Sequence, residues 1–173
     1  MSLGDPKALR EVMSRFPTGV SVITIGFNGE LHGMTANSVT SVSLNPPLIA
    51  VAIDNRAYTE SLVRQSGHFS VNLLARDQIA LSRAFSRAGT RGNELFRSVA
   101  YALGPRGDPL ILGTIGQIGC RVYAGCPAGD HTLWIGAVEE AHWGDAKDPL
   151  VFYHSQYYDI FPWNGAEIYF QPF

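Results

Sequence analysis

Gly19-Val20-Ser21-Val22-Ile23-Thr24-Ile25, followed closely by Asn28-Gly29, carries the clearest fold signal in the sequence. β-Branched side chains occupy most of this run, and such side chains favour the pleated, half-buried surface of a strand. Asn-Gly is a preferred dipeptide for a short hairpin turn, because both of its residues tolerate a positive φ. The stretch therefore predicts a β-hairpin whose return strand begins at Leu31.

Short strand-like runs continue through the rest of the chain. The Ser-, Thr- and Val-rich residues 35–44 end at Asn45-Pro46-Pro47, and the apolar run 48–53 has the length of a strand buried on both faces. Further strands are predicted at residues 68–74, 110–112, 117–123, 131–141 and 150–153, and helices at residues 5–16, 58–65 and 77–87. Many short strands with few helices predict a mainly β fold, an antiparallel barrel or sandwich with peripheral helices.

The length and composition of the chain predict one globular domain spanning residues 1–173. Hydrophobic residues make up 46% and charged residues 16%, which excludes a disordered chain. The net charge is −2 and Lys and Arg form no run, so we expect no nucleic-acid partner. No apolar run approaches the ~20 residues that span a bilayer, so we expect no membrane segment. Cys120 and Cys126 form no CxxC pair, which is typical of a reduced, cytoplasmic protein.

Motifs for covalent or metal chemistry are missing from the sequence. It contains no GxSxG, P-loop or HExxH pattern, and its five histidines lack metal-ligand spacing, so we expect no metal site. The glycines at 113, 116 and 119 stand in a strand-like region, and we interpret them as glycines at a barrel bend. With so few reactive side chains, the sequence favours a bound organic cofactor.

The densest polar segment runs from Gly33 to Ser43, beside the most apolar strand. Six of its eleven residues carry a hydroxyl or an amide. Small side chains let a ligand approach the backbone, and hydroxyl donors beside apolar walls suit an isoalloxazine ring. A Ser- and Thr-rich strand that faces water would have the same composition. From the residues alone, the two interpretations stand about equal.

A second candidate segment is Ala128-Gly129-Asp130-His131, at the start of a predicted strand. A histidine that follows a Gly-Asp turn at the mouth of a strand can point into a pocket, where its imidazole changes protonation near neutral pH. A single histidine is more often structural, and Asp130 is also a common turn residue. The segment alone leaves both readings open.

Together, these segments resemble the short-chain flavin reductase family, the reductase components of two-component flavin monooxygenases. Residues 16–24 are similar to the family's opening strand, residues 33–48 to its flavin-binding signature and residues 68–74 to the next strand. Gly129-Asp130-His131 resembles its nicotinamide-binding motif, and residues 149–154 with Tyr157 resemble its closing strand. The similarity extends from Phe16 to about Tyr158.

The resemblance implies a split β-barrel of the FMN-binding type with Greek-key connections, assembled as a homodimer with flavin near the subunit interface. It implies an enzyme that reduces FMN or FAD by hydride transfer from NADH or NADPH and releases the reduced flavin to a partner oxygenase. His131 would contact the nicotinamide. The implied flavin-binding residues are Thr35, Ala36, Asn37 and Ser38 at the ribityl and phosphate groups, Ser41, Val42 and Ser43 along the ring, and Asn55, Arg56, Thr59 and Arg87 near the phosphate.

Three alternatives stand beside this reading: a non-enzymatic flavin-binding protein, a flavoenzyme of a related barrel such as a pyridoxamine-phosphate oxidase, and a barrel without a ligand. The first would have no use for His131. The second would want a cluster of basic residues for a substrate phosphate. The apolar C-terminal residues 168–173 are interpreted as a candidate interface arm.

Overall fold

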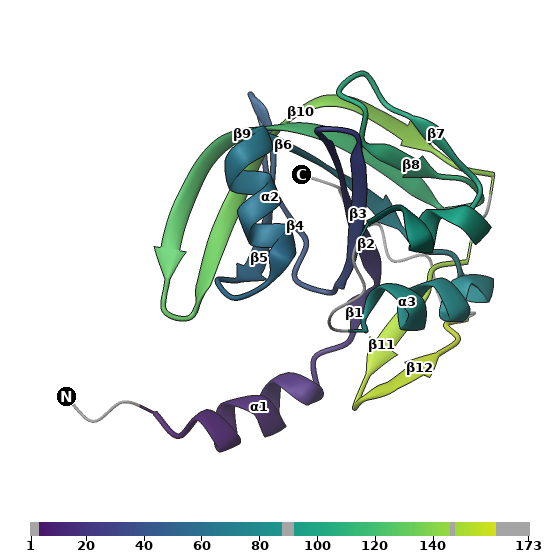
Figure 1. Ribbon diagram of the computed structural model, residues 1–173. Coiled ribbons are helices and arrows are strands. Elements are labelled where there is room, and N and C mark those ends of the chain that lie inside the picture. The colour runs from purple at the N-terminus through teal and green to yellow at the C-terminus, as the bar shows by residue number, and fades with distance from the viewer. Residues whose placement is uncertain (1–3, 88–91, 146–147, 162–173) are drawn as a thin grey trace.

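The computed structural model describes residues 4–87, 92–145 and 148–161 (Figure 1). The apolar residues 168–173 lie outside these ranges. The strands are β1 (Thr18–Gly19), β2 (Ser21–Phe27), β3 (Glu30–Ala36), β4 (Thr40–Leu44), β5 (Pro47–Asp54), β6 (His68–Leu73), β7 (Tyr101–Leu103), β8 (Pro109–Ile111), β9 (Gly116–Ala128), β10 (His131–Trp143), β11 (Val151–Tyr153) and β12 (Gln156–Tyr158). The α-helices are α1 (Pro6–Ser14), α2 (Tyr58–Ser66) and α3 (Ile79–Phe85), and the 3-10 helices are η1 (Arg76–Gln78) and η2 (Gly92–Ser98).

Seven strands form one antiparallel sheet in the order β3-β2-β6-β9-β10-β5-β4. β3 and β4 are consecutive in the chain but stand at opposite edges of this order, so the sheet curls until its two edges approach each other. α2 contacts strands from both halves, β2 and β3 on one side and β5 on the other. Two smaller sheets, β1-β11-β12 and β7-β8, flank the large one (Figure 1). The prediction of a mainly β fold with peripheral helices is confirmed.

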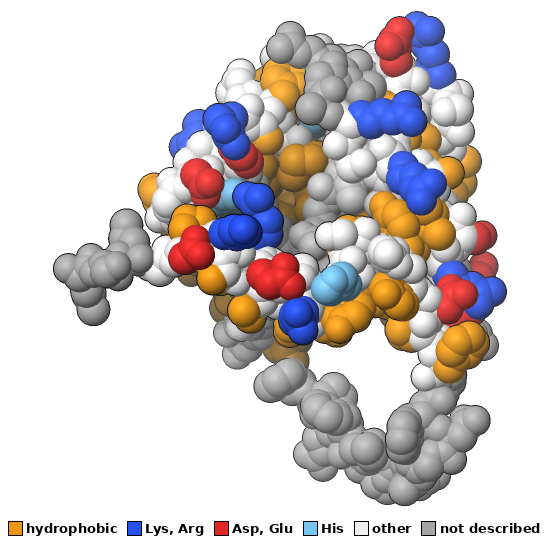
Figure 2. Space-filling model, turned by 90° about the horizontal axis from the view of Figure 1, so that it is seen from below, with side chains coloured by type: hydrophobic (Ala, Val, Ile, Leu, Met, Phe, Trp, Pro, Cys, Tyr) orange, Lys and Arg blue, Asp and Glu red, His pale blue; other side chains and the backbone are white. Residues whose placement is uncertain are grey.

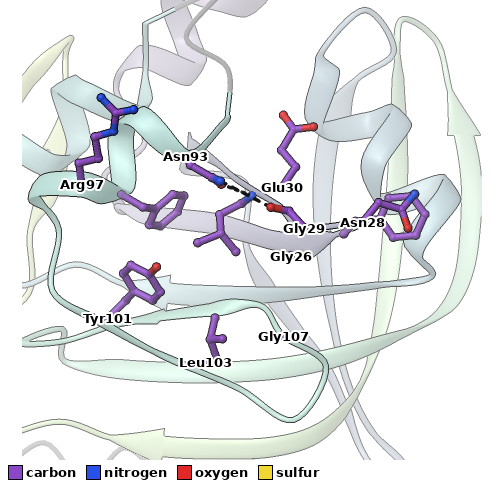
Figure 3. Close-up of a pocket in the computed structure, with 12 residues that line it drawn as sticks. Gly26, Asn28, Gly29, Glu30, Asn93, Arg97, Tyr101, Leu103 and Gly107 are labelled. Atoms are coloured by element: carbon purple, nitrogen blue, oxygen red, sulfur yellow. Dashed lines mark hydrogen bonds between the residues drawn. The ribbon is translucent and has the colours of Figure 1, made fainter.

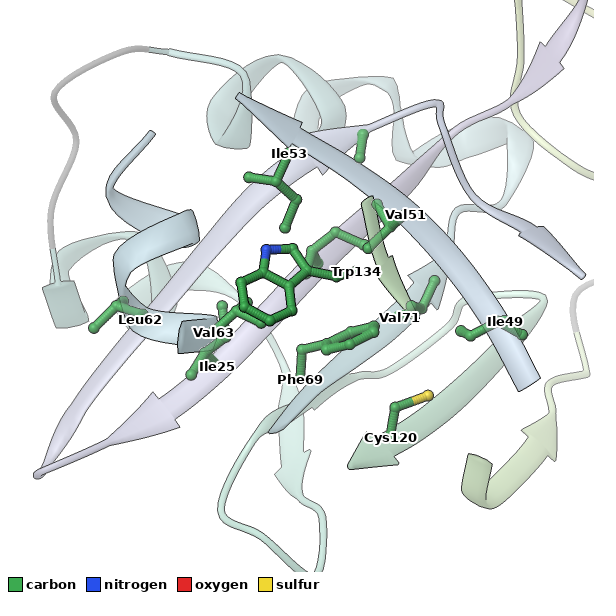
Figure 4. Close-up of a cluster of buried hydrophobic side chains, with 12 residues drawn as sticks. Ile25, Ile49, Val51, Ile53, Leu62, Val63, Phe69, Val71, Cys120 and Trp134 are labelled. Atoms are coloured by element: carbon green, nitrogen blue, oxygen red, sulfur yellow. The ribbon is translucent and has the colours of Figure 1, made fainter. Parts of the chain in front are cut away.

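The alternation of side chains along β2 places it between two hydrophobic clusters. Ile23 and Ile25 belong to the same buried cluster as Trp134. Figure 4 shows Ile25 and Trp134 inside the barrel. Val22, on the opposite face of the strand, packs with Phe85 of α3 in the second cluster. Because successive side chains of a strand point to opposite faces, β2 is buried on both sides. The predicted hairpin turn is also present, with Asn28 and Gly29 at φ 51° and 79°.

The hairpin of β9 and β10 extends beyond its predicted bounds. We expected strands at residues 117–123 and 131–141, whereas the two strands pair from Gly116 with Trp143 to Ala128 with His131. Gly125 and Pro127 are poor strand formers, so local propensity ends the first strand too early. Pairing with β10 overrides that propensity and carries the turn at Gly129 to the end of β5.

The N-terminal helix forms where the sequence predicts it, but its apolar face is exposed. The Asp5 side chain caps α1 by accepting a hydrogen bond from a first-turn N–H, and Pro6 opens the helix. Leu9, Val12 and Met13 are 63%, 66% and 53% exposed, and α1 has no buried residue. The helix stands off from the barrel in Figure 1. The 3.6-residue periodicity thus predicts the helix correctly but does not say what covers its apolar face.

A buried carboxylate fastens the loop before β8 to the barrel. Asp108 is 2% exposed. Its Oδ1 accepts from the Gly26 N–H at 2.8 Å and lies 2.9 Å from His68 Nδ1, and its Oδ2 accepts from the Ser70 hydroxyl at 3.2 Å. A Cβ at Gly26 would lie 2.0 Å from the carbonyl oxygen of Gly107, so only glycine permits this close approach. The loop is therefore held by its backbone and by Asp108 together.

Asp108→Ala is expected to lower the free energy of unfolding by about 3 kcal/mol, because it leaves several buried polar groups without their acceptor. Urea denaturation of the variant and the wild type gives this difference. Asp77→Ala, which removes an exposed carboxylate on η1, is the matched control and should change stability by less than about 0.5 kcal/mol. Equal denaturation midpoints for Asp108→Ala and wild type would contradict the role given to Asp108.

Candidate functional site

Two turns from distant parts of the chain meet at one end of β5. β10 pairs with β5 so that His131 stands opposite Asp54. The turn that follows β5 then runs beside the turn that precedes β10, and the Asn55 N–H donates to the carbonyl oxygen of Asp130 at 2.9 Å. The predicted residues Asn55, Arg56 and His131 are therefore brought together, although 75 positions separate Arg56 from His131 in the sequence.

His131 begins β10 and is partly open to solvent, with 41% of its side chain exposed. Its Nδ1 lies 2.7 Å from Oδ1 of Asp130. The hydrogen bond to the His131 ring holds the pKa of the Asp130 carboxyl below its usual range. Because Nδ1 is engaged, Nε2 is the ring nitrogen with no hydrogen bond to any residue that the structure describes. The histidine therefore presents one polar atom to a ligand.

Arg56 and Asp54 form an exposed ion pair beside His131. Arg56 donates from Nη2 to Asp54 Oδ2 at 2.7 Å and from Nε to Oδ1 at 3.1 Å. The side-chain hydrogen bond from Arg56 is the main reason that the pKa of Asp54 lies well below its ordinary value. The Arg56 side chain is 85% exposed, so a phosphate can approach its guanidinium directly from solvent.

The first turn of α2 follows directly. Among the described residues no side chain caps its N-terminus, at Ala57, so the positive end of the helix dipole faces the side of Arg56 without a capping group. Thr59 is placed differently from Arg56. It is 1% exposed, and its hydroxyl lies 2.9 Å from Nε2 of His32, whose pKa is lowered by burial. The structure thus brings Arg56 and the helix terminus to the surface, and Thr59 into the barrel wall.

The polar segment 33–43 is a strand, a bend and a second strand. β3 ends at Ala36 and β4 begins at Thr40, because the chain crosses here from one edge of the sheet to the other. Ser38 fixes the bend: its hydroxyl donates to the carbonyl oxygen of Ala52 at 2.9 Å and accepts from the Ala52 N–H at 3.2 Å. Thr35 donates to the carbonyl oxygen of Ser82 on α3 at 2.7 Å.

The remaining predicted residues lie at the edge strand and near α3. Ser41 and Val42 are exposed on β4, where Val42 is 50% exposed, and the Ser43 hydroxyl accepts from the Asn45 N–H at 3.2 Å. Arg87 is exposed just after α3. Within the described ranges, the structure does not bring β4 into direct hydrogen-bonded contact with the turn at His131.

Two cavities flank the bend at residues 37–39. One, of about 620 Å³, lies between the end of α1 and the bend, and the other, of about 290 Å³, lies between the bend and α3. Asn37 lines both cavities. The larger is also lined by Met13, Phe16, Ser38 and Thr40, and the smaller by Thr35, Ala36, Ser82 and Tyr157. Ser38, which lines the larger cavity, is bonded to Ala52, two residues before Asp54 on β5, whereas the described residues that line the two cavities include none from the two turns.

The donors in this region fit a flavin nucleotide. Small side chains and hydroxyls border the cavities, apolar side chains supply their walls, and Arg56 with the positive end of the α2 dipole offers charge for a phosphate. Figure 2 shows that the lower face carries acidic and basic side chains next to each other around a hollow with hydrophobic side chains. The described residues contain no group of three or more His, Cys, Asp or Glu side chains that could hold a metal ion.

A third cavity, of about 560 Å³, lies at the far end of the β2–β3 hairpin (Figure 3). Glu30, Asn93, Arg97 and Tyr101 are among its lining residues, and Asn93 fixes the hairpin by accepting from the Leu31 N–H at 2.8 Å. None of the residues predicted to bind flavin or nicotinamide lines this cavity. It is therefore separate from the candidate site.

The helices in the described ranges are all too short or too polar to cross a membrane.

Sequence reasoning missed two features of the site. The contact of Asn55 with Thr132 depends on the pairing of β5 with β10, and the contact of Ser82 with Tyr157 on the packing of α3 against β12. The only signal for either was the polarity of the side chains, which does not name a partner.

Comparisons with known proteins show which family the chain is similar to. The model of the flavin reductase like domain matches residues 13–160. The chain is 40% identical over 151 residues to an NADH-dependent flavin reductase of Rhodococcus sp., covering 86% of this chain and 82% of that one. It is 39% identical over 156 residues to the reductase component of an FADH2-dependent resorcinol hydroxylase of Rhizobium sp., covering 89% and 87%.

A solved structure is similar over nearly the whole chain. It is the NADH:FAD oxidoreductase SgcE6 of Streptomyces globisporus in complex with NAD and FAD fragments, with a TM-score of 0.86 and 34% identity, covering 96% of this chain and all of that one. The split-barrel fold, the Gly129–His131 turn beside β5 and the extent of the family match lead to one conclusion. This chain belongs to the flavin reductase-like domain family.

Proposed function

We propose that this chain is an NADH-dependent flavin reductase that reduces FAD, or FMN in its place, and supplies the reduced flavin to a partner monooxygenase. The meeting of the His131 turn with the turn before α2, on the strand that Ser38 of the cavity bend contacts, carries the proposal, since it would put a nicotinamide contact and a phosphate contact near the flavin segment. The relatives support the choice of cosubstrates, because their names specify NADH, FAD and oxygenase partners.

The residues of this chain would bind and orient, without forming a covalent bond to either nucleotide. Arg56 and the N-terminus of α2 would hold the flavin phosphate, and Thr35, Ala36, Asn37 and Ser38 would border the ribityl chain. Ser41, Val42 and Ser43 would lie along the ring, and Arg87 would add positive charge near the phosphate. When bound, the flavin supplies N5 as the acceptor of the hydride from C4 of NADH.

His131 would hold the nicotinamide through a hydrogen bond that the carboxamide NH2 donates to Nε2, because Nδ1 carries the ring proton that bonds Asp130. Asp130 bonds Nδ1 and thereby fixes the plane of the ring. Hydride transfer needs the two rings in contact and aligned, and holding them so accounts for most of what the protein contributes. His131 thus orients and does not itself donate or accept a proton in the transfer.

An absorbance titration with FAD, FMN and riboflavin tests the flavin part of this proposal. We expect both nucleotides to bind more tightly than riboflavin, because riboflavin lacks the phosphate that Arg56 and α2 would hold. Anaerobic addition of NADH and of NADPH to the loaded protein then identifies the reductant, for which we expect NADH. Equal affinity for riboflavin and FMN would contradict the phosphate site.

The two free cysteines favour a cytoplasmic location for this activity.

We also propose that the chain forms a homodimer in which α1 packs against the second copy. Leu9, Val12, Met13 and Phe16 repeat at helical spacing, and all four are more than half exposed. An apolar face of this kind on a surface helix is typical of a protein interface. Met13 and Phe16 also line the larger cavity, so a copy seated on α1 would lie next to the flavin site.

Val12→Lys is expected to convert the dimer to a monomer and to weaken flavin binding, because a charge on the apolar face of α1 would be buried unpaired in the interface. Light scattering at micromolar concentration measures the mass. Glu11→Gln, which changes the net charge by the same amount on the opposite face of α1, should remain a dimer. A wild-type monomer that still binds flavin would contradict this assembly.

A further inference from the structure

We propose that Asn55 is a positioning residue for the Gly129–His131 turn, and that the Thr132 hydroxyl holds the Asn55 amide in place. The inference rests on the proposed function, in which His131 contacts the nicotinamide. It gives Asn55 a role in NADH use in place of the phosphate contact that family resemblance implies.

Asn55 makes three hydrogen bonds to residues on either side of His131. Its backbone N–H donates to the carbonyl oxygen of Asp130 at 2.9 Å, and its Nδ2 donates to the carbonyl oxygen of Gly129 at 3.4 Å. Its Oδ1 accepts from the Thr132 hydroxyl at 2.8 Å. One residue after β5 thus holds both the turn before His131 and the residue after it.

The Thr132 hydroxyl sets the orientation of the Asn55 amide. Its single proton has two acceptors in range, Asn55 Oδ1 at 2.8 Å and Glu60 Oε1 at 3.5 Å, and the shorter distance assigns the proton to Asn55. Thr132 is 4% exposed, so water does not readily replace it. A flipped amide would place Oδ1 against the Gly129 carbonyl, where two acceptors would repel each other.

Buried charge on α2 stands behind this contact. Glu60 is 7% exposed and accepts from Arg64 Nε at 3.1 Å. The Arg64 guanidinium lies 5.2 Å from the centre of the Trp134 ring on β10, within the range of a cation–π contact. Contacts therefore link α2 and the turn before it to β10 at two places, Thr132 and Trp134. The His131 turn lies next to the contact at Thr132. Movement of the Asn55 amide would shift this turn relative to the start of α2.

Thr132→Val tests the inference, because valine has nearly the shape of threonine and lacks the hydroxyl. We expect the KM for NADH to rise about fivefold to tenfold, as the loss of one hydrogen bond implies, with kcat and the Kd for FAD unchanged. Thr132→Ser keeps the hydroxyl and should restore the wild-type KM. Thermal unfolding of both variants shows whether either change merely loosens the fold.

Asn55→Ala completes a double-mutant cycle. Because both side chains act through the same hydrogen bond, we expect the double variant to show little more than the loss of Asn55→Ala alone. Additive losses, or an unchanged KM for NADH in Thr132→Val, would overturn the inference. A weaker Kd for FAD in Asn55→Ala with an unchanged KM for NADH would also overturn it and would place Asn55 at the flavin phosphate.

His131→Ala separates this inference from the proposed function. If His131→Ala impairs NADH use and Thr132→Val does not, the positioning role alone is wrong. If His131→Ala uses NADH as the wild type does, the nicotinamide contact is wrong, and the positioning role is overturned with it.

Discussion

His131→Ala is expected to lower kcat/KM for NADH by roughly tenfold to a hundredfold while leaving the Kd for flavin unchanged. The loss comes from a nicotinamide ring held less well, since the Nε2 contact disappears and the bond within the turn between the His131 ring and the Asp130 carboxylate is removed. Activity should not vanish, because the transfer needs no acid or base from the protein. Steady-state kinetics at saturating flavin, with a flavin titration of the same preparation, measures both quantities.

Two controls make this result specific. Dithionite needs no nicotinamide site, so it should reduce flavin bound to His131→Ala as it does in the wild type. His142→Ala removes an exposed histidine near the other end of β10, whose Nε2 lies 3.1 Å from Glu140 Oε2. This variant should keep wild-type kinetics. Wild-type NADH turnover in folded, flavin-loaded His131→Ala would remove His131 from the site.

Ser38→Leu is expected to weaken flavin binding by about a hundredfold or more, equivalent to a cost of about 3 kcal/mol. Leucine would fill space beside the larger cavity and would leave the N–H and carbonyl groups of Ala52 without their partner. The bend between β3 and β4 would then shift where the flavin must fit. Fluorescence or absorbance titration with FAD gives the affinity, and circular dichroism shows whether the barrel is intact.

Ser38→Ala distinguishes the two causes of this loss. It removes the same hydrogen bonds but adds no bulk, so it should lower stability by about 1–2 kcal/mol and keep most of the flavin affinity. If Ser38→Leu folds and binds FAD as tightly as the wild type, the flavin does not lie at the bend, and the site must be placed elsewhere.

Much of the fold could be predicted from residue patterns, because those patterns are local. The Asn28-Gly29 turn and the apolar run 48–53 appear where expected, and α2 ends at Gly67 with φ 72°. The break at residues 37–39 was not predicted. Asn37 and Ser38 have low β-propensity, but the strand-like residues on either side masked this local signal. The two strands pair with different neighbours, β2 before the break and β5 after it.

The candidate site could be predicted in its members but not in its contacts. Family resemblance indicates His131, Asn55 and Arg56, yet their proximity depends on the register of β10 against β5, which distant residues decide. The same register brings Thr132 next to Asn55 and creates a hydrogen bond that no sequence motif predicts. The exposed face of α1 likewise follows from tertiary structure, since periodicity alone predicts an amphipathic helix and not its partner.

Anaerobic mixing of flavin-loaded protein with NADH tests the central claim most directly. We expect the absorbance of oxidised flavin to disappear upon addition of NADH, more slowly in His131→Ala at the same NADH concentration, and to return when air is admitted. Flavin that binds the protein and is reduced by dithionite, but stays oxidised with excess NADH and NADPH, would contradict the account and leave a flavin-binding protein without reductase activity.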